Sequence, residues 1–467
     1  MKRIAVIGGG LAGLAGAVAL SESEHAVALY ERRRILGGRA SSFIHPTGNE
    51  LVDNCQHVLL RCCTNLIDFY EKLGVSDGVS FSQEIPFLDE SNQLSIIKNS
   101  NLPAPLHLLP SFFRFKALGI RDKIAIGYGM ARMLLTMSHL SDYESQSILS
   151  WLRSHGQTNR TLEAFWHPIL VSALNDELDD ITASYGIATI VKAFLLNKQG
   201  YEVGLPVVAL GDLYEPGAAY LADRGGTVTI NQGVSRIDLD NGQVVSVTLQ
   251  NGETIHADVY LSAVPFDVLL KLLPEDSVKS EPYFSNLKKL EVSPITAVHV
   301  WFDRPITDLD FAAVLGRTVQ WVFNQTIRHQ HEDDAGSYLG LVISASDELM
   351  KLPQQEIIDR AMEDLKDMFP LVGEATLVKA IVVKEGRATF APKPGCDAQR
   401  PGSVSPIGNL FVSGDWTQTG WPATMEGAVR SGYHAAEAIL ESLQTPRRIL
   451  KPDMPAEGFM RWFDGNP

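Results

Sequence analysis

The sequence predicts an α/β protein with two interleaved domains, and three observations support this prediction. The first forty residues read as an apolar strand, a glycine-rich turn, an apolar helix and a second strand. Residues 225–263 read as a β-meander, with alternating strands separated by Asn-Gly turns. A chain of 467 residues is also too long for one ordinary hydrophobic core.

The N-terminal unit has the pattern of a Rossmann-like dinucleotide-binding motif. Residues 3–7 are an apolar run rich in β-branched side chains, and Gly8, Gly10 and Gly13 follow it as G-x-G-x-x-G. The first glycine permits a tight turn, and the second lets the backbone approach a pyrophosphate. The third allows the helix and the strand to pack closely. The spacing therefore predicts a dinucleotide site at the start of the helix.

An acidic residue closes this unit at the place where a ribose would lie. Glu31 follows the second strand, residues 26–30, and stands 23 positions after Gly8. A carboxylate there suits a ribose hydroxyl and repels a 2′-phosphate, so Glu31 by itself is compatible with NAD or FAD. We expect Leu11 and Ala12, at the helix N-terminus, to face the phosphate charge.

The overall composition excludes several classes of protein. The formal net charge of −15 argues against general nucleic-acid binding, and no apolar run is long enough to predict a transmembrane helix. The four cysteines form neither a C-x-x-C pair nor a zinc-site spacing, so we expect no metal site and no disulfide framework in a reducing cytoplasm. The start of the chain also resembles a signal peptide, but the glycines at fingerprint spacing argue against that alternative.

Two further glycine motifs extend the predicted cofactor site. Gly38 and Arg39 follow the arginine run that begins at Arg32, where backbone can approach a diphosphate and a cation can pair with it. Near the C-terminus a buried strand ends at Gly414 and Asp415, and a second helix begins close by. Asp415 suits a polyol hydroxyl, while the helix N-terminus suits a phosphate or a flavin carbonyl. The residues assigned to this helix start are Met425, Glu426 and Ala428, and Val234 in the meander is assigned to the adenine.

A polar cluster interrupts an apolar stretch at residues 51–60, which we predict to be a buried strand. Asp53, Asn54, Gln56 and His57 are able to hydrogen-bond or titrate, and such groups need partners when they are buried. A satisfied internal network is one interpretation. A group of this kind beside a cofactor is also the best candidate for a polar reaction site in the first half of the chain.

The segment 101–140 combines prolines and aromatic residues with an excess of cations. At helical spacing, Ile124, Tyr128, Ala131 and Leu135 share one face. The cations are Arg114, Lys116, Arg121, Lys123 and Arg132. This composition suits a monotopic contact with anionic lipid headgroups. The alternative is a helical hairpin whose apolar side belongs to the core.

The predicted domains are discontinuous. We assign residues 1–85, 205–270 and 405–445 to the cofactor domain, and residues 86–204 and 271–404 to an α+β substrate domain that contains the helical segment. Residues 446–467 form a tail. Within these regions the patterns predict helices at 65–73 and near 355–368, and a strand at 295–302.

These motifs together resemble the flavin amine oxidase and phytoene desaturase superfamily, in which the corresponding residues hold FAD. The resemblance rests on the first glycine motif with Glu31, on 37–39, and on 414–415 with 426–428. Within the superfamily, residues 52–60 together with Trp166-His167-Pro168 and Ala173-Leu174-Asn175 are similar to the squalene-associated branch, the hydroxysqualene dehydroxylases.

The resemblance implies a reductive dehydroxylation in which an allylic C30 alcohol becomes squalene. Loss of the hydroxyl as water leaves an allylic cation, and a reduced flavin can deliver hydride to it. The protein must protonate the leaving oxygen and exclude water. His57 suits the proton donor by residue type, with Asp53 holding its tautomer and Asn54 or Gln56 bonding the hydroxyl.

Three alternatives stay open at this point. A carotenoid-type desaturase uses the same cofactor in the opposite direction, and a non-catalytic prenyl-binding escort would have a related fold without flavin. A soluble amine oxidase fits less well, because no middle segment resembles a small polar pocket. A lipophilic isoprenoid substrate would enter from a membrane, so we expect peripheral attachment to the inner face of the cell membrane. An external reductant must recharge the flavin, and no motif indicates which.

Overall fold

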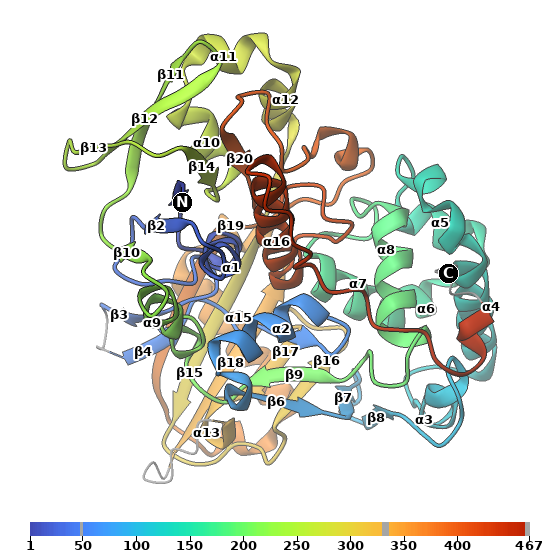
Figure 1. Ribbon diagram of the computed structural model, residues 1–467. Coiled ribbons are helices and arrows are strands. Elements are labelled where there is room, and N and C mark those ends of the chain that lie inside the picture. The colour runs from blue at the N-terminus through green and yellow to red at the C-terminus, as the bar shows by residue number, and fades with distance from the viewer. Residues whose placement is uncertain (47–49, 329–335, 463–467) are drawn as a thin grey trace.

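A five-stranded parallel sheet carries the N-terminal motif in the computed structural model, which describes residues 1–46, 50–328 and 336–462 (Figure 1). Its strand order is β10-β2-β1-β14-β20, so distant parts of the chain supply neighbouring strands. The strands are β1 (Arg3–Ile7), β2 (Ala26–Tyr30), β10 (Thr227–Thr229), β14 (Val259–Ser262) and β20 (Leu410–Val412). Two helices, α1 (Leu11–Ser21) and α16 (Met425–Ser442), pack together beside this sheet. The predicted α/β, Rossmann-like fold is confirmed.

The region predicted as a single β-meander divides between two sheets. An antiparallel sheet contains β11 (Val234–Asp240), β12 (Gln243–Leu249) and β13 (Thr254–Ile255). The predicted turn at Asn241 and Gly242 joins its first two strands, and both residues have positive φ, as a tight hairpin turn requires. The flanking strands β10 and β14 instead join the parallel sheet. The prediction of one meander was wrong here because β14 is buried at all four positions, as a central parallel strand requires.

A seven-stranded mixed sheet forms the floor of the second part of the molecule, in the order β19-β15-β18-β17-β16-β7-β8. Its strands are β7 (Glu84–Leu88), β8 (Leu94–Lys98), β15 (Val292–Phe302), β16 (Phe311–Val314), β17 (Trp321–Asn324), β18 (Ser337–Ser344) and β19 (Leu377–Phe390). Helix α15 (Gln354–Met368) packs on one face through Ile357, Ala361 and Leu365. The predicted strand at 295–302 and the predicted helix near 355–368 are thereby confirmed.

Helices cover the remainder of the second part and join it to the first (Figure 1). The predicted helix at 65–73 is α2 (Thr64–Leu73), which ends at Gly74 in the left-handed conformation. The other helices are α3 (Leu109–Phe113), α4 (Ile120–Thr136), α5 (Ile148–Ser154), α6 (Asn159–Thr161), α7 (His167–Leu174), α8 (Ala183–Ile190), α9 (Pro216–Ala222), α10 (Phe266–Leu272), α11 (Glu275–Ser280), α12 (Pro282–Ser285), α13 (Gln325–Arg328) and α14 (Asp347–Met350). Small sheets pair β3 (Ser42–His45) with β4 (Glu50–Asp53), and order β5 (Leu59–Leu60), β9 (Val203–Pro206) and β6 (Val79–Ser82).

The segment after α16 links the two parts of the molecule. The backbone N–H of Leu450 donates to Glu437 on α16, and farther along the N–H of Phe459 donates to Ala104 O beside α3. Within the described ranges, every helix is too short or too polar to cross a lipid bilayer. The exact domain limits stay a prediction, and residues 463–467 of the predicted tail lie outside the described part of the chain.

Candidate functional site

A cavity of about 990 Å³ extends from the glycine turn after β1 into the apolar interior above the seven-stranded sheet. The sequence-predicted cofactor residues that line it are Gly8, Gly10, Leu11, Ala12, Glu31, Arg32, Gly38, Arg39, Val234, Gly414, Asp415, Met425, Glu426 and Ala428. Three members of the polar cluster, Asn54, Gln56 and His57, also line it, whereas Gly13 and Asp53 do not. The fold therefore brings four distant stretches of sequence to one cavity.

The three glycines of the first motif differ in why each position is glycine. Gly8 has a φ of +105°, so the turn after β1 needs a residue that tolerates this conformation. A Cβ on Gly13 would lie 1.9 Å from the Gly8 carbonyl oxygen, which makes glycine a packing requirement of α1 against the turn. Gly10 differs from both, because its backbone is extended and the nearest heavy atom to an added Cβ is 3.8 Å away.

Glu31 fixes the shape of the turn at the end of β2. Its Oε2 accepts a hydrogen bond of 2.6 Å from the Gly9 N–H, and its Oε1 accepts one of 2.6 Å from the Arg33 N–H. The second glycine loop packs on the first, since the Gly37 N–H donates to the Gly9 carbonyl at 2.9 Å. A carboxylate oxygen has a second lone pair, so Glu31 can still accept from a ribose hydroxyl.

Arg39 and Asp415 lie 376 positions apart in sequence and form an ion pair in the cavity wall. Arg39 Nη2 donates to Asp415 Oδ1 at 2.6 Å, and Arg39 Nη1 donates to the Ala388 carbonyl at 2.7 Å. Arg39 lines the cavity as predicted, and its guanidinium neutralises a carboxylate that is only 6 % exposed, while its pairing with a diphosphate stays a prediction. A buried carboxylate requires such a partner.

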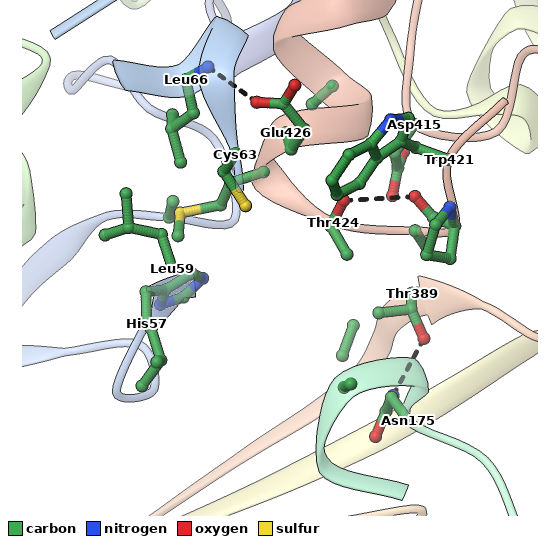
Figure 2. Close-up of a pocket in the computed structure, with 18 of the residues that line it drawn as sticks. His57, Leu59, Cys63, Leu66, Asn175, Thr389, Asp415, Trp421, Thr424 and Glu426 are labelled. Atoms are coloured by element: carbon green, nitrogen blue, oxygen red, sulfur yellow. Dashed lines mark hydrogen bonds between the residues drawn. The ribbon is translucent and has the colours of Figure 1, made fainter. Parts of the chain in front are cut away.

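The start of α16 faces the cavity, but the Glu426 side chain turns away from it (Figure 2). Thr424 caps the helix, since its hydroxyl accepts from the Gly427 N–H at 3.0 Å. Glu426 is fully buried and accepts from the Leu66 N–H at 2.7 Å, and it also pairs with Arg430 at 2.6 Å. The prediction that Glu426 binds the cofactor is therefore wrong for its carboxylate, which caps α2 instead.

Residues 51–60 do not form one strand, as predicted, but two short strands with a loop at 54–58. Asp53 ends β4 and turns away from the cavity, where its Oδ1 accepts from Ser42 Oγ at 2.6 Å and from the Leu210 N–H at 3.2 Å. Burial raises the pKa of Asp53 to about 6. The role predicted for Asp53, holding the tautomer of His57, was wrong, because Asp53 turns to Ser42 and Leu210 and the Cys55 carbonyl bonds His57 Nδ1 instead.

His57 projects from this loop into the cavity (Figure 2). Its Nδ1 lies 2.7 Å from the Cys55 carbonyl, which can only accept, so Nδ1 carries the proton and Nε2 is a hydrogen-bond acceptor. Burial lowers the pKa of His57, and the positive charge of Arg39 lowers it further. A neutral imidazole with an acceptor atom available does not suit the proton-donor role that the sequence predicted.

The other two members of the cluster face different neighbours. Asn54 Nδ2 donates to the Arg39 carbonyl at 3.1 Å and contacts Glu385 Oε2 at 3.3 Å. Gln56 Oε1 accepts from Gln325 Nε2 at 2.6 Å. The polar loop is thus tied both to the cofactor end of the cavity and to its sheet floor.

Several cavity residues were missed by reasoning from the sequence. The apolar part is lined mainly by aliphatic and aromatic side chains, among them Ile85, Phe87, Phe112, Phe165 and Leu195. The polar residues missed there are Asn175, Lys192, Ser344, Glu385, Thr389 and Trp421. Asn175 donates to Thr389 Oγ1 at 2.9 Å and so closes one end of the floor (Figure 2). For Glu385 a signal existed, since it continues the alternating row of Ile381 and Val383 with a charge.

The space around Gly10 shows that these residues fit a dinucleotide. An extended backbone tolerates any residue, and the surroundings leave room for a Cβ, so the fold itself does not require glycine at this position. A bare backbone at the N-terminus of α1 is what the close approach of a diphosphate requires. The fold and the site together define a dinucleotide-binding protein with a large apolar ligand cavity.

Comparison with known proteins identifies the family. Residues 11–440 match the family of flavin containing amine oxidoreductases. The chain therefore belongs to that family, and it is an FAD-dependent oxidoreductase. Membership of this family excludes the alternative of a flavin-free escort protein. Within the described residues, no cluster of three or more histidine, cysteine, aspartate or glutamate side chains could hold a metal ion.

The related sequences include carotenoid enzymes. The 15-cis-phytoene desaturase of Synechococcus elongatus is 29% identical over 94% of this chain and 96% of its own length. The probable zeta-carotene desaturase of the same organism is 27% identical over 94% of this chain and 99% of its own. Among solved structures, wild-type putrescine oxidase bound to putrescine has a TM-score of 0.71 at 16% identity, over 94% of this chain and 99% of its own. That structural likeness concerns the fold alone.

Proposed function

We propose that this FAD enzyme acts on a long isoprenoid chain held in the apolar part of the cavity. The main support for this proposal is that the cavity is continuous. The residues predicted to bind the dinucleotide and the residues of the apolar interior line the same space. A volume of about 990 Å³ is at the upper end of the usual range for ligand sites. Such a lining has little to offer a small polar amine.

Desaturation of a carotenoid-type substrate is the reaction that the related sequences support most. The named relatives, a phytoene desaturase and a zeta-carotene desaturase, match this chain over almost its whole length. In this reaction the bound FAD supplies the two-electron acceptor. The protein must place the reacting carbon, keep water away and provide a group that accepts a proton.

Reductive dehydroxylation of hydroxysqualene to squalene is the second candidate, and the polar loop at 54–58 favours it. A pure hydrocarbon makes no use of hydrogen-bonding groups, yet His57 Nε2 is available as an acceptor in the cavity wall, with Asn54 and Gln56 on the same loop. An allylic hydroxyl could donate to His57 there. The resemblance of residues 52–60 to the squalene-associated branch points the same way.

Single-turnover assays on the purified holoenzyme distinguish these reactions. Hydroxysqualene is mixed anaerobically with photoreduced enzyme, and phytoene with oxidised enzyme, and the extracted lipids are analysed by mass spectrometry. Squalene from the first mixture supports dehydroxylation, and a product two hydrogens poorer than phytoene supports desaturation. If neither substrate changes while the flavin oxidises a primary amine, the isoprenoid proposal is wrong.

We also propose that the cavity opens onto a membrane, so that the substrate enters from lipid. Helix α4 buries Ile126 and Met133 and exposes the face of Ile124, Tyr128 and Leu135. The alternative that this second face belongs to the core is thereby overturned. Ile124 is 65 % exposed and also lines the cavity, which supports an opening within the apolar surface.

This apolar surface extends beyond the segment predicted from sequence. Its exposed members are Leu102, Leu106, Phe113, Ile120, Ile124, Tyr128, Leu135, Phe459 and Trp462, and we call them the apolar patch. The last two come from the C-terminal segment, which Met460 anchors by packing on Ala104. Contiguous exposed apolar side chains of this kind mark an interaction site. Exposed Arg114, Lys116 and Arg121 beside it favour a bilayer with anionic headgroups over a protein partner.

Vesicle co-sedimentation tests the membrane proposal. We expect the holoenzyme to sediment with phosphatidylglycerol-containing vesicles. The combined charge reversal of Arg114, Lys116 and Arg121 should weaken this about 100-fold or more at low salt, since each cation contributes about 1 kcal/mol and each 1.4 kcal/mol is a factor of ten. Lys366→Glu is the matched control, because Lys366 is exposed on α15. Equal sedimentation of the triple variant and the control would argue against an anionic surface.

A further inference from the structure

The floor of the cavity carries a carboxylate that the flavin site does not use. Glu385 on β19 is the register partner of Ile295 on β15, which in turn pairs with Ser344 on β18. All three line the cavity, as directly opposed residues in antiparallel strands share one face. The neighbouring Lys384 points to the opposite face, where its amine donates to the Leu352 carbonyl.

The other carboxylates in the cavity lining already have strong partners. Glu31 is held by two backbone N–H groups at 2.6 Å, and Asp415 is paired with Arg39. Glu426 is buried behind the wall with Arg430. Glu385 has only longer contacts, from Asn54 Nδ2 at 3.3 Å and from the Arg387 N–H at 3.2 Å. Within the described part of the chain, no lysine, arginine or histidine nitrogen forms a salt bridge with it.

Glu385 lies between the cofactor end of the cavity and its apolar part. Through Asn54 it adjoins Arg39, whose partner Asp415 stands at the end of the cofactor strand β20. Along its own strand it is followed by Thr389, which faces the apolar part. A carboxyl group at this junction lines the cavity between its cofactor end and its apolar part. His57 cannot replace it as a donor, because its Nδ1 proton is committed to the Cys55 carbonyl.

We propose that Glu385 is the residue that transfers the proton to or from the isoprenoid substrate, an inference that rests on the proposed function. FAD supplies the redox partner, taking up a hydride when oxidised and giving one when reduced. In desaturation the substrate carbon that has lost hydride is a cation. The adjacent C–H bond then breaks, its proton passes to the Glu385 carboxylate, and its electron pair becomes the new double bond.

In dehydroxylation the same residue acts in the opposite sense. The Glu385 carboxyl gives its proton to the substrate hydroxyl, the C–O bond breaks with its electron pair on oxygen, and water leaves. Bound reduced FAD would supply the hydride that the allylic carbon needs. Either turnover is balanced with one equivalent of flavin and needs no further redox partner. His57 Nε2 would hold the hydroxyl before it leaves.

Substitution of Glu385 by glutamine tests the proposal, with Glu374→Gln as the control because Glu374 is exposed. We expect Glu385→Gln to keep its FAD and bind substrate within about threefold of wild type, while the single-turnover rate falls about 100-fold or more, as for loss of a general acid or base. Glu385→Asp should retain part of the rate.

Infrared difference spectra give a readout independent of turnover. Substrate is added to enzyme in the flavin redox state that cannot react, and the carboxyl region is recorded. We expect a band that changes on binding in the wild type and in Glu374→Gln but is absent in Glu385→Gln. A retained band, or a wild-type rate in Glu385→Gln, would overturn the assignment of Glu385. Failure of the wild type to convert either substrate would instead overturn the proposed function.

Discussion

Replacing Gly10 by alanine should weaken FAD binding and leave the folded chain intact. Gly10 has φ −71° and ψ 176°, a conformation open to any residue, and an added Cβ would meet nothing closer than the Gly38 Cα at 3.8 Å. The free energy of unfolding of the apoprotein should therefore stay the same or rise by up to about 1 kcal/mol, because alanine restricts the unfolded chain more than glycine does.

The cost of this substitution should appear in cofactor binding. The new methyl group stands at the N-terminus of α1, where the diphosphate must approach the backbone. Inserting a methyl group into a close contact costs about 1–3 kcal/mol. The Kd for FAD should then rise about 5- to 150-fold, since each 1.4 kcal/mol is a factor of ten.

Gly13→Ala should behave in the opposite way, although the two glycines belong to the same motif. A Cβ on Gly13 would lie 1.9 Å from the Gly8 carbonyl oxygen, so the helix and the turn would have to separate by more than 1 Å. Overpacking against backbone of this kind should lower the free energy of unfolding by about 3 kcal/mol. The apoprotein itself should be destabilised, before any cofactor is added.

Two measurements on the apoproteins separate these effects. Urea unfolding gives the free energy of unfolding, and quenching of flavin fluorescence on titration with apoprotein gives the Kd. Gly373→Ala is the control, since Gly373 is exposed and its added Cβ would have no atom within 4 Å. Wild-type affinity in Gly10→Ala, or wild-type stability in Gly13→Ala, would refute the division of roles between the two glycines.

Three further experiments test the electrostatic contacts. Glu426→Ala should lower the free energy of unfolding by about 2 kcal/mol in urea titrations, because two N–H groups of α2 would lose their acceptor while Arg430 keeps its pair with Asp453; a loss below 1 kcal/mol would contradict the capping role. A double-mutant cycle of Arg39→Ala and Asp415→Ala should give a coupling energy of about 0.5–3 kcal/mol in the same titrations, and additivity would refute the pair. Asp53 has a pKa raised to about 6, so its stabilising contribution is present below pH 3.8 and is lost as the pH rises through 6. Between pH 4 and pH 7, Asp53→Asn should therefore lose about 2–3 kcal/mol less unfolding free energy than the wild type. A pH profile of unfolding free energy parallel to that of the wild type would count against this.

The cofactor half of the site was predictable because its determinants are local. The turn after β1, the packing of Gly13 and the position of Glu31 all follow from the spacing of residues within one βαβ unit. The strand order could not be obtained in the same way, since β10 and β14 come from the region that reads as a meander. Long-range pairing decided which strands joined the parallel sheet.

The substrate half was less predictable because its contacts join distant segments. Asp53 and His57 looked like partners from their spacing, but the chain turns between them, and Ser42 and Leu210 occupy the carboxylate. Arg39 was correctly placed at the cavity, yet its partner is 376 residues away. Pairing of side chains across such separations depends on topology, which local patterns do not contain.

The distribution of charge along the cavity relates the two proposals to each other. At the cofactor end Asp415 is paired with Arg39 and Glu31 accepts from two backbone N–H groups, while Phe113 and Ile124 line the end beside the apolar patch. In the proposed function, a lipophilic chain that enters through the apolar patch meets apolar side chains on its way to the junction. There it meets Glu385, a carboxylate without a salt bridge among the described residues. Its oxygens accept hydrogen bonds from Asn54 Nδ2 and from the Arg387 N–H, and each oxygen keeps a second lone pair. A carboxylate of this kind can take up or release a proton at the junction, where the proposed reaction requires one to move.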